Sequence, residues 1–305
     1  MKRVVVTGAT SMLGIALIEE CVCNGIEVLA IVRRESSNLL RIPNSNSIKL
    51  IECNLNEFKE LNGITEEYDV FYHFAWDYTS KEKRDNARCQ DYNIEYTLDA
   101  VELAKKLGCH TFVGAGSQAE YGRVSNIITP STSTNPENAY GIAKYAAGRL
   151  SGLLCRDLGI KHIWTRIFSV YGKYDNEGTM IRYAIEELLK GVKPSFTKSE
   201  QLWDYLYSKD AGRAFYLIGQ YGSDKSVYCL GSGTVRTLEE YIKIINQMVN
   251  PNLTVGIGEK EYAYNQVMHL CADISSLTFD TGFKPIYKFE EGIAETIQWL
   301  KENNK

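Results

Sequence analysis

A tyrosine and a lysine one helical turn apart are the residues of this chain best suited to proton chemistry. The segment Asn138-Ala139-Tyr140-Gly141-Ile142-Ala143-Lys144 separates Tyr140 and Lys144 by four positions, so both project from one face of a helix. An ammonium close to a phenol favours the phenolate and lowers the pKa of the tyrosine. Such a tyrosine can give a proton to, or take one from, a carbonyl or alcohol oxygen during hydride transfer.

Spacing alone does not single out this pair, because the chain contains 20 tyrosines. The same spacing occurs at Tyr205/Lys209 and Tyr221/Lys225. What distinguishes Tyr140 is its place in the helix that follows the fifth expected strand, with Ser117 just past the end of that strand. A hydroxyl there could hydrogen-bond the same substrate oxygen and share its developing charge. We therefore predict Ser117, Tyr140 and Lys144 as the catalytic set.

The N-terminal segment Thr7-Gly8-Ala9-Thr10-Ser11-Met12-Leu13-Gly14 predicts a phosphate-binding loop. It follows an expected strand and opens an expected helix, whose N-terminus suits a pyrophosphate. Gly8 would make the tight turn and Gly14 would let the helix approach the sheet. Ser11 stands where a middle glycine is usual, and its hydroxyl could bond a phosphate oxygen. The alternative is a plain strand-to-helix turn. The predicted cofactor contacts here are Gly8, Thr10, Ser11, Met12, Leu13 and Gly14.

The end of the second expected strand bears on the choice of cofactor. An acidic residue there would bind the adenosine ribose hydroxyls of NAD, whereas arginine would pair with the 2′-phosphate of NADP. This chain has Arg33 and Arg34, with no acid before Glu35. The pattern favours NADP with Arg33 as a contact, and NAD is the alternative. The two arginines could also be solvated charges at a strand end.

Short apolar runs alternate with helical patterns through the first half of the chain. Strands are expected at 4–7, 28–32, 49–52, 70–74, 111–114 and 162–167, and helices at 13–22, 93–107 and 137–158. Gly159 is a plausible cap for the last of these helices. This alternation predicts an α/β fold with a Rossmann-type, doubly wound parallel sheet, which binds ligands at the carboxyl ends of its strands.

The alternation of short strands with helices becomes less regular after Gly172. Helices are expected at 179–190, 210–220, 238–249 and 290–302, and strands at 202–207 and 226–230. We predict a dinucleotide-binding domain over 1–172, to which segments near 205–235 return. The remainder of 173–305 would form mostly a smaller C-terminal substrate-binding lobe.

Composition excludes several classes of protein. The 305 residues carry a net charge of −4, which argues against binding a nucleic-acid backbone. No apolar run approaches the roughly 18 residues of a membrane span, and the apolar N-terminal run is too short for a signal peptide. The eight cysteines have no metal-ligand spacing, so free thiols and no metal are expected. A cytoplasmic protein with no membrane or nucleic-acid partner is predicted.

Four motifs together resemble the extended short-chain dehydrogenase/reductases, the epimerase/dehydratase-like enzymes of nucleotide sugars. They are Thr7 to Gly14, Ser117 to Gly122, Tyr140 to Lys144 and Arg166-Ile167-Phe168-Ser169-Val170-Tyr171-Gly172. Leu202–Asp210 resembles the family's substrate-lobe strand and Asp273–Leu300 its C-terminal end, so the resemblance covers nearly the whole chain.

The resemblance implies roles for further residues. Ser117, Tyr140 and Lys144 match the family's Ser/Thr–Tyr–Lys triad, and Lys144 would also hold the nicotinamide ribose. Asn54 and Leu55 fall where the adenine ring is met, and Phe74 and Ala75 where the cofactor's phosphates and ribose pass. Asn93 matches a family asparagine whose role is left open. The family's enzymes act as 4-epimerases, 4,6-dehydratases, decarboxylases or 4-ketoreductases on nucleotide sugars.

The segment after the fifth strand bears on which reaction to expect. The family's dehydratases carry acidic residues where this chain has Gln118 and Ala119, so a dehydratase is disfavoured. Epimerases usually have a small or apolar residue where Glu120 stands, and an acid there resembles 4-ketoreductases. A turn-capping carboxylate is the alternative for Glu120. The leading prediction is an NAD(P)H-dependent 4-ketoreductase of a nucleotide-linked 4-keto-6-deoxyhexose. A 4-epimerase with tightly bound NAD is the alternative, and a non-catalytic cofactor-binding protein is a third class.

Substrate contacts are predicted partly from departures from the family pattern. Ser169 stands where an asparagine often contacts the sugar nucleotide, and Trp203 where an arginine often clamps the pyrophosphate. Arg182, Arg213 or a backbone site would then supply the positive charge, or Trp203 would stack on the base or simply pack in the core. The predicted substrate contacts are Glu120, Ser169, Arg182, Trp203 and Arg213. A homodimer through helices 93–107 and 137–158 is implied by the resemblance.

Overall fold

A parallel sheet organises the molecule. The computed structural model describes residues 1–80 and 82–303. Its main sheet consists of β1 (Arg3–Thr7), β2 (Glu27–Val32), β3 (Ile48–Glu52), β4 (Val70–His73), β5 (Thr111–Ser117), β6 (Lys161–Ile167) and β10 (Val227–Leu230). The strands lie in the order β10-β6-β5-β4-β1-β2-β3, and every pairing is parallel. The predicted Rossmann-type fold is confirmed.

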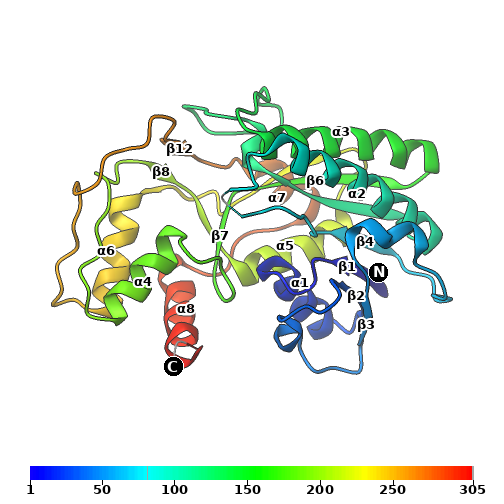
Figure 1. The fold of residues 1–305 in the computed structure, drawn as a ribbon, viewed down its shortest axis with the longest axis horizontal. Coiled ribbons are helices and arrows are strands. Elements are labelled where there is room, and N and C mark those ends of the chain that lie inside the picture. Colours follow the sequence, from blue (N-terminus) through cyan, green and yellow to red (C-terminus); the bar gives the residue numbers. More distant parts are fainter. Residues whose placement is uncertain (81, 304–305) are drawn as a thin grey trace.

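Helices cover both faces of this sheet (Figure 1). One face carries α1 (Met12–Cys23), α5 (Ser208–Tyr221) and α7 (Ser275–Thr281), and the other carries α2 (Ala87–Lys106) and α3 (Ala139–Leu158). Alternate residues of one strand therefore pack into two separate hydrophobic cores, one on each face of the sheet. Val4 and Val6 pack with the first group of helices, whereas Val5 packs with α2 and α3. Such double-sided burial is why the strands read as continuous apolar runs.

The strand order changes direction between β1 and β4. From β1 the chain builds outward through β2 and β3, and then returns to the other side through β4, β5 and β6. The connections after β1 and β4 therefore leave on opposite faces, and a crevice opens between them at the carboxyl ends of the strands. Thr7, the last residue of β1, pairs with His73, the last residue of β4, so both strands end at that crevice.

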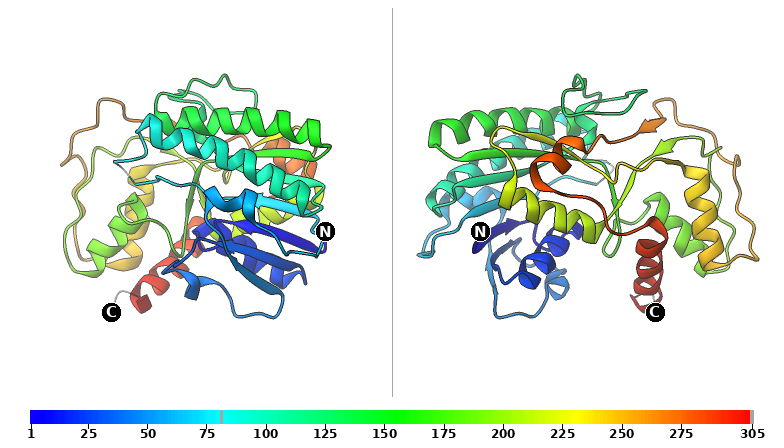
Figure 2. Two further views of the ribbon diagram at one scale, coloured as in Figure 1. Left: turned by 45° about the vertical axis from the view of Figure 1, so that its right-hand side comes forward. Right: turned by 180° about the vertical axis from the view of Figure 1, so that it is seen from behind.

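Segments from the second half form a lobe beside the sheet (Figures 1 and 2). Its helices are α4 (Met180–Leu189), α6 (Leu238–Val249) and α8 (Phe289–Asn303). Their apolar faces share one core with Tyr171, Tyr207 and Phe196. Its short strands are β7 (Ser169–Tyr171), β8 (Leu202–Trp203), β9 (Tyr205–Tyr207), β11 (Arg236–Thr237) and β12 (His269–Leu270). The chain also returns to the main sheet through α5, β10 and α7.

The prediction of one strand over 202–207 is wrong. The segment divides at Asp204 into β8, which pairs with β11 and β12, and β9, which pairs with β7. The fully buried carboxylate of Asp204 accepts hydrogen bonds from the backbone amides of Ser232 (2.7 Å) and Gly233 (3.0 Å). These bonds fix the chain between the two short strands to a loop that is distant in the sequence. The local apolar pattern therefore cannot predict the division of the strand.

The second long helix begins earlier than the predicted Asn93. It starts at Ala87, because the Asn86 side chain accepts a hydrogen bond from the backbone amide of Cys89 (3.1 Å) and caps the helix. The predicted helix over 137–158 begins at Ala139 and ends, as expected, at Gly159 in the left-handed conformation (φ 69°).

Three further features of the molecule bear on the expectations about membranes, disulfides and pairing of two copies. No helix within residues 1–80 and 82–303 is long and apolar enough to cross a membrane. All eight cysteines are free thiols. Ile142, Leu150 and Leu153 are exposed on α3, and Tyr92 is exposed on neighbouring α2. Pairing of two copies through these helices stays a prediction.

Candidate active site

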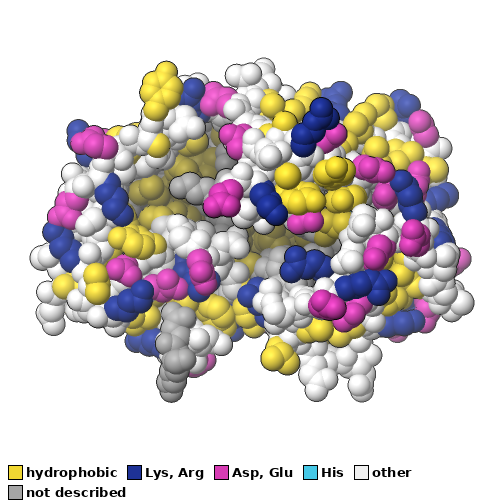
Figure 3. All heavy atoms as spheres, viewed as in Figure 1, with side chains coloured by type: hydrophobic (Ala, Val, Ile, Leu, Met, Phe, Trp, Pro, Cys, Tyr) yellow, Lys and Arg dark blue, Asp and Glu magenta, His cyan; other side chains and the backbone are white. Residues whose placement is uncertain are grey.

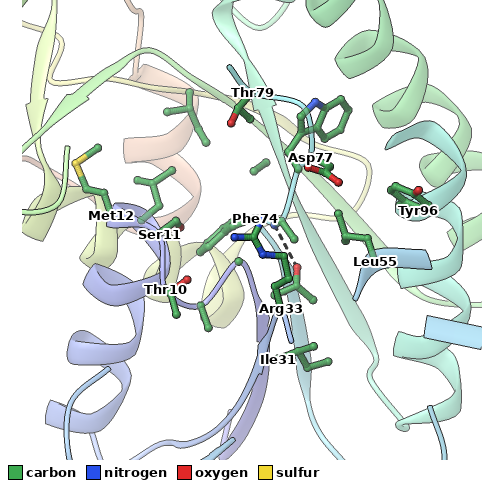
Figure 4. A pocket seen from close by; sticks show the side chains of 18 of the residues that line it. Thr10, Ser11, Met12, Ile31, Arg33, Leu55, Phe74, Asp77, Thr79 and Tyr96 are labelled. Atoms are coloured by element: carbon green, nitrogen blue, oxygen red, sulfur yellow. Dashed lines mark hydrogen bonds between the residues drawn. The ribbon is translucent and has the colours of Figure 1, made fainter. Parts of the chain in front are cut away.

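A cleft of about 770 Å³ lies at the carboxyl ends of β1, β4 and β5. Figure 3 shows the hollowed surface, and Figure 4 shows residues that line the cleft. Fourteen of the residues predicted to contact cofactor or substrate line it: Gly8, Thr10, Ser11, Met12, Leu13, Arg33, Asn54, Leu55, Phe74, Ala75, Ser117, Tyr140, Lys144 and Ser169. Five do not: Gly14, Glu120, Arg182, Trp203 and Arg213.

The loop between β1 and α1 has the shape that a pyrophosphate requires. Gly8 has a φ of +66°, and a Cβ on it would come within 2.7 Å of the Ala75 backbone nitrogen. A Cβ on Gly14 would come within 2.4 Å of the Gly8 carbonyl oxygen, which explains why a glycine outside the cleft is needed for close helix packing. Ser11 caps α1 by accepting a hydrogen bond from the Gly14 amide (3.1 Å). The Ser11 hydroxyl hydrogen therefore remains to meet a phosphate oxygen.

The two predicted adenosine-side arginines have different surroundings. Arg33 lines the cleft between the α1 loop and Leu55 (Figure 4). The Arg34 Nε instead donates to the Glu57 carboxylate at 2.9 Å, outside the lining of the cleft. Asn54 accepts a hydrogen bond from the Arg34 amide (3.3 Å) and begins a short 3-10 helix, η2 (Leu55–Glu60). Of the two predicted arginines, only Arg33 lines this end of the cleft.

Ser117, Tyr140 and Lys144 line the same cleft from β5 and α3. The Ser117 hydroxyl oxygen accepts a hydrogen bond from the Ala119 amide (3.1 Å), which leaves its hydrogen to donate to Tyr140 or to a ligand. Burial raises the pKa of Tyr140, while the charge of Arg84 and the nearby Ser117 hydroxyl lower it. The group can thus present a phenol as donor and a phenolate as acceptor at one ligand oxygen.

The position of Lys144 is set by burial. Its ammonium donates to the Ala115 carbonyl oxygen (2.7 Å) and lies 3.5 Å from the ring centroid of Trp76. It is 5.8 Å from the Tyr140 ring centroid. Burial lowers the pKa of Lys144 to about 7. The lysine therefore changes charge near neutral pH, where the presence of an anionic ligand would favour its charged form.

The other two Tyr-x3-Lys pairs do not form such a site. Tyr205 packs edge-on against Tyr241 within an aromatic cluster, and Lys209 pairs with Glu295 at 2.6 Å. Tyr221 is 61 % exposed at the end of α5. Position in the fold, rather than spacing, distinguishes Tyr140.

Glu120 does not reach the cleft, contrary to the predicted substrate contact. It is fully buried, with Oε1 accepting from the Ser117 amide (2.8 Å) and from Trp164 Nε1 (2.9 Å). Its Oε2 accepts from Arg166 Nε (2.7 Å). With Ser117 it forms a capping box around the 3-10 turn η3 (Gln118–Glu120), which is the alternative considered from the sequence. Glu120 holds Ser117 in place.

Three other predicted substrate contacts also act at a distance from the cleft. Arg182 donates to the Asp175 carbonyl oxygen and to Glu186, both at 2.7 Å, and so supports the cleft-lining segment 174–176. Trp203 Nε1 donates to the Ser169 hydroxyl (2.7 Å) and orients that residue. Arg213 lies behind the cleft, bonded to the Lys284 carbonyl and near Asp210, so it supplies no charge to a ligand.

Several cleft residues had no signal in the sequence pattern: Arg41, Trp76, Arg84, Tyr174 and Asp175. Arg41 lies with its guanidinium carbon 4.9 Å from the Tyr174 ring centroid, facing the loop before α1. Burial raises the pKa of the Asp175 carboxyl to about 6. These side chains come from connections between elements, where no periodicity marks them.

Asn93, whose role the sequence left open, is a structural residue behind the cleft. It is 1 % exposed, its Oδ1 accepts from the Asp77 amide (2.8 Å), and its Nδ2 donates to the Asp77 carbonyl (3.1 Å). It fixes the backbone just beyond β4 to α2.

Comparison with known proteins agrees with the resemblance inferred from the motifs. A family model described as "NAD dependent epimerase/dehydratase family" matches residues 4–231. A dTDP-glucose 4,6-dehydratase of Salmonella typhimurium is 22% identical, over 99% of this chain and 94% of the relative. Two solved structures share the fold. A Thermotoga maritima UDP-glucose 4-epimerase with UDP-glucose has a TM-score of 0.87 at 20% identity, covering 99% of this chain and 100% of that one. A Bacillus cereus UDP-glucuronic acid 4-epimerase in complex with NAD has a TM-score of 0.83 at 17% identity, with the same coverage.

Proposed function

Because this chain belongs to the NAD dependent epimerase/dehydratase family, we propose that it catalyses hydride transfer at C4 of a nucleotide-linked hexose. The observation that carries the proposal is the convergence of Ser117, Tyr140 and Lys144 on the cleft that also contains the glycine loop. A nicotinamide dinucleotide, when bound, would accept and return the hydride. The residues that would hold it are those of the Gly8–Leu13 loop, Arg33, Asn54 and Lys144.

The chain's own residues would handle the proton. Tyr140 as phenolate takes the proton of the C4 hydroxyl while the C4–H bond breaks, and the product is a 4-keto sugar. Ser117 donates a hydrogen bond to the same oxygen and stabilises its negative charge. Tyr140, now a phenol, would return the proton when hydride is restored to C4, and inversion requires that this hydride reach the opposite face of the keto sugar. Lys144 favours the phenolate whenever it is charged.

Within this chemistry we propose 4-epimerisation as the leading activity, with NAD as cofactor. The sequence-based preference for a 4-ketoreductase depended on Glu120 and on two arginines. Both oxygens of Glu120 are bound to protein groups, and Arg34 pairs with Glu57. Similarity to a UDP-glucuronic acid 4-epimerase in complex with NAD supports the NAD assignment. Gln118 and Ala119 still argue against water elimination, because neither can serve as an acid or a base.

A 4-ketoreductase that uses NADPH is the second candidate, and Arg33 is the observation that favours it. Its guanidinium lines the adenosine end of the cleft, where it could pair with a 2′-phosphate. In that reaction a 4-keto sugar nucleotide takes hydride at C4 and a proton from Tyr140. The two candidates share the proton chemistry and differ in whether the cofactor is consumed.

One experiment separates them. The purified protein is incubated with NAD and, in turn, with UDP-, dTDP-, GDP- and CDP-linked hexoses, and separately with NADPH and the corresponding 4-keto-6-deoxy sugar nucleotides. Products are identified by NMR. Inversion at C4 with no net change in NADH supports the epimerase. Oxidation of NADPH only when a 4-keto-6-deoxy sugar nucleotide is added supports the reductase. No turnover with any of these substrates contradicts both and favours a non-catalytic cofactor-binding protein.

A further inference from the structure

The segment that connects β4 to α2 lies against the residue proposed to transfer the proton. The Trp76 ring meets the Tyr140 ring edge-on, with centroids 6.0 Å apart. The guanidinium carbon of Arg84 lies 4.1 Å from the Tyr140 ring centroid, within the range of a cation–π contact. The Asp85 carboxylate accepts a hydrogen bond from the Ala139 amide (3.0 Å), one residue before Tyr140. Three side chains of one connection therefore meet the start of α3.

Buried polar side chains of α2 fix the near end of this connection. Gln90 accepts from Trp76 Nε1 (2.9 Å) and donates to the Tyr78 carbonyl oxygen (3.0 Å). Asn93 bonds both backbone groups of Asp77. Gln90 and Asn93 are each 1 % exposed, an unusual burial for amides, and each bonds a cleft-lining residue without lining the cleft itself. Their bonds hold this end of the connection against α2.

Arg84 is closer to the Tyr140 ring than Lys144 is. The two cations lie 4.1 Å and 5.8 Å from the ring centroid, and Lys144 is directed to the Ala115 carbonyl and the Trp76 ring. Of the acidic neighbours, Glu120 pairs with Arg166 but its charge still raises the pKa of Tyr140, and Asp85 bonds the Ala139 amide. Of the charges around the ring, that of Arg84 is the principal one that lowers the pKa of Tyr140 against the effect of burial.

We propose that Arg84 is a positioning residue for Tyr140. Arg84 packs on the Tyr140 ring and supplies a positive charge that lies closer to this ring than the charge of Lys144 does. The proposal rests on the function proposed above, since it concerns the residue assigned the proton transfer there. Arg84 also lines the cleft, so its charge faces the space in which the substrate oxygen would lie. Lys144 is then left mainly to bind the cofactor, and Arg84 to set the charge state of Tyr140.

The test compares Arg84→Gln, which removes the charge, with Arg84→Lys, which keeps it. Arg88→Gln is the matched control, because Arg88 is exposed in the first turn of α2 and does not line the cleft. Tyrosine labelled at Cζ is incorporated into the full chain, and the Tyr140 signal is assigned by its loss in Tyr140→Phe. NMR then follows its ionisation with pH in the absence of substrate, and turnover is measured over the same pH range.

In Arg84→Gln we expect the ionisation of Tyr140 to move to higher pH, and turnover below the wild-type midpoint to fall roughly three- to tenfold. Arg84→Lys should restore much of the shift, and Arg88→Gln should match the wild type. A Tyr140 ionisation that is the same in Arg84→Gln and wild type overturns the inference, whatever happens to the rate. That result would leave the proposed function intact, whereas near-normal turnover in Tyr140→Phe would contradict the proposed function without altering the NMR comparison.

Discussion

Arg166 Nε donates to Glu120 Oε2 at 2.7 Å, and both side chains are almost wholly buried beneath the cleft. The other Glu120 oxygen binds the Ser117 amide, so the ion pair supports the end of β5 at the point where Ser117 enters the cleft. An acid that the sequence predicted as a substrate contact thus has a structural role. Its contribution can be measured separately from catalysis.

Glu120→Gln should destabilise the fold by about 3 kcal/mol, because it leaves the buried Arg166 guanidinium without a counter-charge. Urea unfolding of the variant and the wild type measures the difference. Glu137→Gln is the control, since its pair with Arg123 is exposed and should be worth less than about 1 kcal/mol. A raised KM in Glu120→Gln with unchanged stability would contradict the structural role and revive the predicted substrate contact.

Arg33→Ser should weaken NADP binding by roughly tenfold and change NAD binding by less than about twofold, because only NADP has a 2′-phosphate for the guanidinium. Equilibrium binding of both dinucleotides by calorimetry checks this. Arg34→Ser should have a smaller effect on either cofactor, since Arg34 is paired with Glu57. If Arg33→Ser weakens the binding of NAD and NADP equally, Arg33 does not contact the 2′-phosphate.

Lys144→Met should raise the free energy of unfolding, relative to the wild type, by roughly 2 kcal/mol more at about pH 6 than at about pH 9. Burial lowers the pKa of Lys144 from 10.5 to about 7 in the folded protein. Between those values the unfolded chain holds a proton that the folded protein lacks, so this residue makes the free energy of unfolding rise with pH. Below about pH 7 the folded protein carries the buried ammonium and its full desolvation cost, which methionine removes.

Denaturant unfolding of Lys144→Met and wild type at both pH values measures that difference. Lys105→Met, at an exposed position on α2, should show no comparable pH dependence. A difference between Lys144→Met and wild type that is the same at both pH values would mean that Lys144 is not held in a neutral form by burial.

Much of the sheet could be predicted because the residues of each strand themselves mark where it lies in the sequence. Residues such as Val4, Val5 and Val6 are all buried, so each parallel strand appears as an unbroken apolar run between helical patterns. The division at Asp204 could not be predicted, because its hydrogen-bond partners lie about thirty positions away in the chain. The start of α2 was missed because its first turns carry charged residues without an apolar stripe.

The candidate site divides in the same way. Gly8 and Gly14 follow from a loop motif whose spacing has a direct physical meaning, and Tyr140 and Lys144 follow from their spacing together with their place after the fifth strand. Arg84 lies in the run Ser80-Lys81-Glu82-Lys83-Arg84-Asp85, which from its composition resembles a solvated surface loop. Only the fold brings it onto the Tyr140 ring. Glu120 illustrates the converse, since a motif match could not reveal that Trp164 and Arg166 occupy both of its oxygens.

In the proposed function, Tyr140 exchanges a proton with the C4 oxygen of a nucleotide-linked hexose. The most direct test is the turnover of Tyr140→Phe on whichever sugar nucleotide the wild-type protein converts, with calorimetric binding of cofactor and substrate measured alongside. We expect kcat to fall roughly 10²–10⁴-fold with dissociation constants within about threefold of the wild type, because only the proton-bearing oxygen is removed. A variant that keeps near wild-type kcat would contradict the account.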